Sequence, residues 1–165
     1  MKLLMYSFFV LLIAPCNSSK KLAKAEDPNT NKNSKVVISY QATPCFGRCA
    51  LFTLTINGET KTATYLGTQN IEKIGTYTKP ITEKELDALV KAFDDAKFTT
   101  LNDEYLGNIT DFPIKIISYT VNGKTKQIKE RSGAPEELIH LEKVLLDYAN
   151  SEGWKKSDDS TNSKD

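Results

Sequence analysis

The chain has 165 residues, of which 22 are Lys or Arg and 21 are Asp or Glu, so its formal net charge is +1. Its hydrophobic content of 39% is too high for a chain that is disordered throughout and too low for a multispan membrane protein. Because binding to phosphates requires a surplus of basic side chains, the charge balance also argues against a nucleic-acid partner.

The first sixteen residues have the features of an export signal. Lys2 precedes an apolar run over residues 3–14, which has the length of a signal-peptide core and is too short to cross a bilayer of about 30 Å. Cys16 follows this run at the position where a bacterial lipobox places its acylated cysteine. We therefore expect residues 1–15 to be a signal peptide and Cys16 to carry a lipid that holds the protein on a membrane.

Polar residues predominate in the segment after the predicted signal peptide and in the last eleven residues. Residues 16–35 are mainly Lys, Asn, Ser, Thr and Ala, and residues 155–165 are similarly polar. We interpret the first stretch as a solvated tether and the second as a disordered tail, so residues 36–154 form a single domain. Cleavage after Ala25, at the small-x-small site of residues 23–25, is the alternative to lipidation.

The first part of the domain has the pattern of β-strands. Residues 36–41 are rich in β-prone side chains and predict a strand. Asn57-Gly58 lies between two further β-prone runs, which is the strongest short-range signal for a hairpin. A two-residue turn there pairs Phe52 with Ala63 on the buried face and Thr53 with Thr62 on the wet face.

Further strands are expected later in the chain. A second hairpin is centred on Asn122-Gly123 and pairs Val121 with Lys124, Tyr119 with Lys126 and Ile117 with Ile128, with Thr120 opposite Thr125 behind them. A short strand is expected over residues 74–77. The Asn-Gly dipeptide again predicts a two-residue turn.

Two helices are predicted. Thr82 and Glu85 form a capping box, and apolar residues then recur at helical spacing. The second helix begins near residues 134–135, and its inner stripe consists of Leu138, Leu141, Leu145 and Tyr148. The order of elements predicts an α+β domain: an antiparallel sheet of about five to six strands with two helices packed on one face.

Cys45 and Cys49 are the most informative residues for chemistry. In an exported chain, two nearby cysteines favour a disulfide, and Pro44 and Gly47 allow the turn that a spacing of four requires. A thiol–disulfide exchange site is the functional alternative, with Arg48 as the nearby positive charge. A metal site would need further ligands.

Other candidate residues predict no cofactor and no metal. Asp103, Glu104 and Asp111 are acidic but lack the close alternation of a calcium loop. His140 lies on the second helix away from the apolar stripe, with no nucleophile beside it in the sequence. Among these residues the sequence predicts no catalytic group.

Several segments together resemble a known family. They are Thr43-Pro44-Cys45-Phe46-Gly47-Arg48-Cys49, the downstream Asn-Gly hairpin, and residues 98–105, 110–113 and 133–138. They resemble a domain of unknown function found largely in envelope proteins of Bacteroidota, many of them predicted lipoproteins. The similarity covers about residues 36–150. It implies domain limits and a compartment, but no activity, cofactor or catalytic residue.

The sequence thus predicts an exported, lipid-anchored envelope protein of the periplasm or outer membrane. We expect it to act as a non-enzymatic binding or scaffold module for an envelope protein or polymer. It would bind through its sheet or through an interaction loop that includes Phe46 and Arg48, with Asp111 as a further contact. A redox protein that uses Cys45 and Cys49, or an inhibitor of a secreted hydrolase, are the alternatives.

Overall fold

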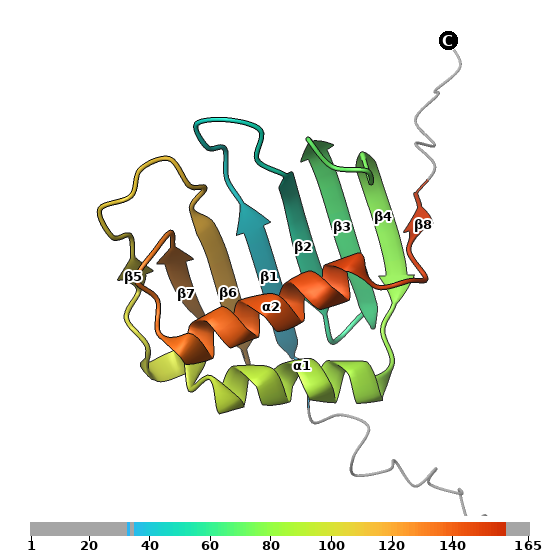
Figure 1. The fold of residues 1–165 in the computed structure, drawn as a ribbon. Coiled ribbons are helices and arrows are strands. Elements are labelled where there is room, and N and C mark those ends of the chain that lie inside the picture. The colour runs from blue at the N-terminus through green and yellow to red at the C-terminus, as the bar shows by residue number, and fades with distance from the viewer. Residues whose placement is uncertain (1–32, 34, 158–165) are drawn as a thin grey trace, which may run out of the picture.

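A computed structural model describes residue 33 and residues 35–157. The predicted signal peptide, the lipidation site Cys16 and most of the predicted tether lie outside the described residues, as do residues 158–165 of the predicted tail. The described chain forms one open sheet and two helices (Figure 1). In chain order the elements are β1 (Val36–Ala42), β2 (Leu51–Asn57), β3 (Thr62–Gln69), β4 (Gly75–Pro80), α1 (Glu83–Asp95), the 3-10 turn η1 (Phe98–Thr100), β5 (Glu104–Tyr105), β6 (Lys115–Val121), β7 (Lys124–Glu130), α2 (Glu136–Asn150) and β8 (Lys155–Lys156).

The predicted α+β class is confirmed, but the predicted sheet is too small. Eight strands lie in the order β5-β7-β6-β1-β2-β3-β4-β8, and the sheet is mixed because β5 runs parallel to β7. The additional edge strands β5 and β8 have two residues each, too few for an alternating pattern to be visible in the sequence. Lys155 and Lys156 pair with Thr78 and Tyr77 of β4, so the structured domain extends into the predicted tail.

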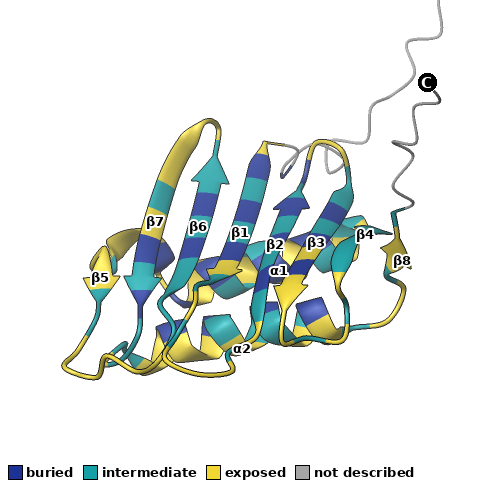
Figure 2. Cartoon of the chain, turned by 90° about the horizontal axis from the view of Figure 1, so that it is seen from above, coloured by how far each residue is buried: buried dark blue, intermediate teal, exposed yellow. Residues whose placement is uncertain are grey.

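The helices cover one face of the sheet and leave the other face open (Figures 1 and 2). Alternate residues of the central strands point toward the helices and are buried there. The opposite face is rich in hydroxyl groups. One cross-strand row on this face consists of Gln127, Ser118, Ser39, Thr55, Thr64, Thr78 and Lys155.

The second predicted hairpin has the predicted register. Val121 pairs with Lys124, Ile117 with Ile128, and Thr120 with Thr125. Asn122 and Gly123 have φ values of 50° and 78°, the left-handed backbone that a two-residue type I′ turn requires. The observed turn is the one that the Asn-Gly dipeptide favours by itself.

The register predicted for the first hairpin is wrong. The loop is four residues long, so Phe52 pairs with Gly67 and Ile56 with Ala63. The Asn57 side chain accepts hydrogen bonds from the backbone of Glu59 and Thr60, which builds a longer turn. The shift is even in residue number, and therefore the predicted apolar face still points into the core.

Gly58 has a long-range role that explains the longer turn. Its N–H donates to the Val36 carbonyl at 2.8 Å. A Cβ atom at this position would lie 2.3 Å from the carbonyl oxygen of Asn33. The glycine is needed because the incoming chain crosses directly over it, and not because of a left-handed φ.

The helix signals agree with the structure. Thr82 caps α1, and the Glu85 side chain accepts from the Thr82 backbone in the predicted capping box. Leu138, Leu141 and Leu145 of α2 are buried as predicted, whereas Tyr148 of the predicted stripe is only partly buried. Pro135 lies at the N-cap, just before the first helical residue. The short strand predicted over residues 74–77 is longer and begins one residue later, as β4.

Trp154, just before β8, packs against Tyr65 and Tyr148. Because both tyrosines are shielded from solvent, we expect the domain to lose stability at high pH. The Trp154 ring lies 5.8 Å from that of Tyr65 and 6.1 Å from that of Tyr148. Burial raises the pKa of both tyrosines to about 12, with Glu85 adding to the effect at Tyr148. An unfolded tyrosine has a pKa of about 10.

Folding favours the protonated form of both phenols. Their contribution to the free energy of unfolding is therefore fully present below pH 10 and is lost as the pH rises toward 12. We therefore expect the urea midpoint of unfolding to fall steeply over this interval. Tyrosinate absorbance recorded on the same samples should develop together with unfolding. A midpoint that stays constant up to pH 12 would contradict this expectation.

Candidate interaction surface

The loop between β1 and β2 is closed by the predicted disulfide, which joins Cys45 and Cys49 with a Cα–Cα distance of 5.9 Å. The chain reverses direction inside the bridge, where the Gly47 N–H donates to the Cys45 carbonyl at 3.0 Å. Gly47 has a φ of 148°, a conformation that side chains disfavour. The bridge, the glycine and the local hydrogen bond together fix the shape of this short loop.

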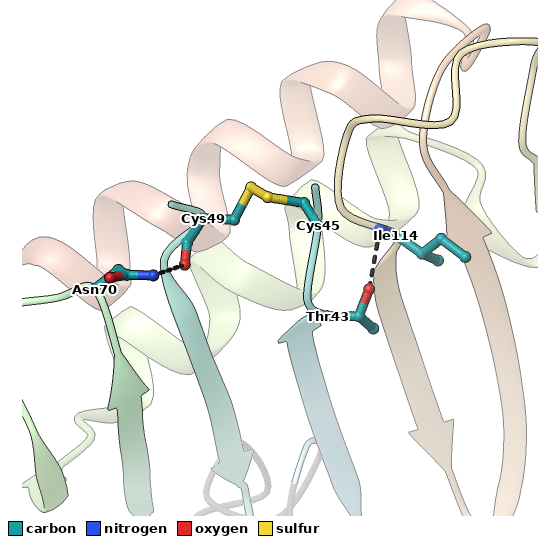
Figure 3. The surroundings of a disulfide bond; sticks show 5 residues. All are labelled: Thr43, Cys45, Cys49, Asn70 and Ile114. Carbon is teal, nitrogen blue, oxygen red and sulfur yellow. Dashed lines mark hydrogen bonds between the residues drawn. A yellow bond between two sulfur atoms is a disulfide. The ribbon is translucent and has the colours of Figure 1, made fainter. Parts of the chain in front are cut away.

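Two neighbouring loops are hydrogen-bonded to the disulfide loop (Figure 3). The backbone N–H of Ile114, which precedes β6, donates to the Thr43 hydroxyl at 3.0 Å, and the Thr43 N–H donates to the Ile114 carbonyl at 3.0 Å. On the other side, the Asn70 amide donates to the Cys49 carbonyl at 3.0 Å. We call these three loops, residues 43–50, 70–74 and 106–114, the disulfide end of the sheet.

The disulfide end carries most of the exposed large apolar side chains. Four side chains, which we call the apolar tips, are exposed there: Phe46 by 94%, Phe112 by 57%, Ile74 by 47% and Ile109 by 46%. Two others in the described chain are exposed, Leu66 on β3 and Ile139 on α2. Exposed apolar side chains gathered on one part of a surface are typical of contact sites.

Exposed charged residues lie on the same loops as the apolar tips. Arg48 is exposed within the disulfide loop, and Asp111 is exposed in the neighbouring loop of residues 106–114. The structure therefore places Phe46, Arg48 and Asp111, the residues of the predicted interaction loop, on adjoining loops at one end of the sheet. Ile74, Ile109 and Phe112 were not predicted as part of this surface.

A buried charged cluster lies under α2 at the same end of the sheet. Lys115, the first residue of β6, contacts the Glu130 carboxylate and lies 2.8 Å from that of Glu142. The Tyr40 hydroxyl donates to Glu142 at 3.3 Å. The cluster joins three strands of the sheet to α2 directly beneath the loops.

The environment of this cluster raises two pKa values. Burial, and then the Glu142 carboxylate, raises the pKa of Tyr40. Burial alone would lower the pKa of Lys115, but the contacts with Glu130 and Glu142 outweigh it and raise the pKa. Lys115 is therefore the cation that compensates two buried carboxylates. This cluster could not be predicted from the sequence, because its members are spread over residues 40–142.

The other sequence candidates lie apart from the disulfide end. Asp103 and Glu104 form ion pairs with Lys126 and Lys129 at the β7 edge. His140 is exposed beside a hollow of about 270 Å³ between the helices. Within residues 33 and 35–157, no group of three or more His, Cys, Asp or Glu side chains is arranged to hold a metal ion. No helix in this described part has the length and apolarity needed to cross a membrane.

Removing the disulfide is expected to have a moderate and local effect. In the chain-entropy model, closing a five-residue loop contributes about 2 kcal/mol to stability. The double variant Cys45→Ser/Cys49→Ser should therefore lose about 2 kcal/mol of unfolding free energy in urea titrations. Hydrogen exchange should accelerate in residues 43–50 and remain slow in the central strands. Faster exchange throughout the sheet would show that the bridge holds more than its own loop.

Comparisons with known proteins add one finding. A family model described as a domain of unknown function (DUF6438) matches residues 36–149. The matched range begins with β1 and ends one residue before the end of α2, so it includes all three loops of the disulfide end. This agrees with the resemblance to a family of unknown function. A search of curated proteins finds no match.

Proposed function

The chain belongs to this DUF6438 family of unknown function, and we propose that it acts as a non-enzymatic binding module whose binding surface is the disulfide end. The observation that supports this proposal is the gathering of Phe46, Ile74, Ile109 and Phe112 on three hydrogen-bonded loops. The bridge and the hydrogen bonds shape these loops before a ligand arrives. Such preorganisation favours binding because less conformational entropy is lost on association.

We propose further that the module is exported and lipid-anchored in the envelope of a bacterium of the Bacteroidota type. Three features support this location: the apolar run of residues 3–14, the position of Cys16 behind it, and a disulfide of the kind that persists in oxidising compartments. The lipid on Cys16 would give the periplasmic or outer-membrane location. An envelope component is then the ligand that the disulfide end would meet.

The position of the tether is compatible with this role. The chain enters the domain at Asn33 and Val36, at the end of β1 opposite to the disulfide loop (Figure 1). The Asn33 side chain donates to Asp87 of α1 at 2.6 Å, which fixes the entry point on the helical layer. An anchor at this entry point leaves the apolar tips free to meet a ligand.

Photo-crosslinking in the intact envelope tests the binding surface. A benzophenone side chain at position 46 should form a covalent adduct with one defined envelope component on illumination, because position 46 is exposed on the loop. The same group at position 139, an exposed apolar position on α2, is the matched control and should give no discrete adduct. Equal labelling from both positions, or none from position 46, would contradict the proposal.

The sequence alternatives predict other results in the same experiment. An inhibitor of a secreted hydrolase would be labelled in a one-to-one adduct with an enzyme. A redox protein would instead lose its disulfide to a dithiol substrate, with a low-pKa thiol exposed in the reduced form. Titration of thiols on the native protein, with and without reductant, separates this redox alternative from a binding role.

A further inference from the structure

We infer that the ligand of the disulfide end is the surface of a lipid bilayer, into which the apolar tips insert. The inference rests on the proposed function and names the partner of the same surface. Stable attachment of a protein to a membrane commonly combines two signals. The predicted acyl chains on Cys16 would attach the chain to a membrane, and the apolar tips would add a separate contact with the same surface.

The arrangement of the tips favours lipid over a folded partner. The four tips are spread over three loops, with Ile109 and Phe112 on the same loop, and Phe46 is almost fully exposed. The hollow beside the disulfide has a volume of about 240 Å³, and none of its lining residues, which lie within residues 44–51 and 69–70, is an apolar tip. A folded partner would need a matching pocket for each tip, whereas acyl chains accommodate separate apolar side chains without preformed pockets.

Charges around the tips nearly cancel. Arg48 lies two residues after Phe46, and Arg131 donates to the Ile109 carbonyl at 3.3 Å. Glu72 and Asp111 are exposed on the same loops as Ile74 and Phe112, and the partly buried Lys73 adds one further cation beside Ile74. Because anionic lipid would attract the arginines and repel the carboxylates, insertion should depend on the apolar tips and only weakly on lipid charge.

The length of chain between the lipid and the domain permits this contact. Cys16 precedes Asn33 by 17 residues, which can span at most about 60 Å. The seven residues of β1 separate the entry point from the disulfide end by about 24 Å. A chain anchored at Cys16 can therefore bring the tips to the same bilayer, where the tether keeps their local concentration high.

Tryptophan fluorescence on liposomes tests the inference. The chain purified with its native N-terminus is reconstituted in liposomes of phosphatidylethanolamine and phosphatidylglycerol, with plain or brominated acyl chains. The variants Phe46→Trp and Phe112→Trp report on the tips, and Ile139→Trp is the matched control on α2. Wild-type protein, whose single tryptophan is Trp154, gives the emission to be subtracted from that of each variant.

We expect brominated chains to reduce the added emission at positions 46 and 112 about twofold or more, and to leave position 139 unchanged. The result should be similar when phosphatidylcholine replaces phosphatidylglycerol. Absence of quenching at positions 46 and 112, or equal quenching at position 139, would overturn the lipid assignment. If position 46 instead crosslinks to a protein in the envelope, the proposed binding function stands and only the lipid assignment fails. If position 46 crosslinks to nothing, the proposed function and the lipid assignment both fail.

Discussion

Replacing Lys115 with Met is expected to lower the unfolding free energy by about 3–5 kcal/mol, because it removes the cation that compensates two buried carboxylates. Glu130 and Glu142 are both largely buried and lie at the junction of the sheet and α2. Adding Glu142→Gln to the Lys115→Met variant should restore part of the loss, because one buried charge is then removed. Urea titration followed by circular dichroism measures all of these values.

Lys143→Met is the matched control for this substitution. Lys143 pairs with Asp147 one helical turn along α2, and both side chains are largely exposed. Exposed pairs of this kind contribute about 0.3–0.5 kcal/mol. Comparable losses in Lys115→Met and Lys143→Met would show that the buried cluster does not join the sheet to α2.

Replacing Phe93 with Ala is expected to cost about 3–5 kcal/mol of unfolding free energy. Phe93 of α1 is 1% exposed, and its ring lies 4.4 Å from that of Tyr119 and 4.9 Å from that of Phe98. Truncation leaves a cavity between α1 and the sheet and removes both aromatic contacts. The urea midpoint should fall, with an unchanged dependence on denaturant.

The same truncation at Phe46 is the informative comparison. Since Phe46 is exposed, Phe46→Ala should change stability by no more than about 0.5 kcal/mol. It should instead reduce binding by the disulfide end. A large loss of stability in Phe46→Ala would mean that this side chain is part of the core and cannot be a contact residue.

The two Asn-Gly dipeptides show what local sequence can and cannot predict. Asn122-Gly123 forms the expected turn because its own backbone preference decides the register. Asn57-Gly58 does not, because Gly58 accommodates the chain at Asn33, which is remote in the sequence. In both hairpins the side chains predicted to face the core do so, because the face on which a side chain lies depends only on whether its position along the strand is odd or even.

The candidate surface could be predicted only in part. Phe46, Arg48 and Asp111 were predicted as an interaction loop, and the predicted Cys45–Cys49 bridge is present. Ile74, Ile109 and Phe112 join the surface because β1 and β3 end, and their neighbours β2 and β6 begin, at the same end of the sheet. This strand order results from long-range pairing, which hydropathy patterns do not contain.

Intact-mass spectrometry of the protein isolated from its native envelope tests the central claim most directly. The claim is that an exported chain presents loops held by a closed Cys45–Cys49 bridge. The account predicts a mass that lacks residues 1–15, includes acyl chains on Cys16 and falls by two hydrogens relative to the reduced form. A chain that retains its first fifteen residues, with both loop cysteines as free thiols, would contradict it.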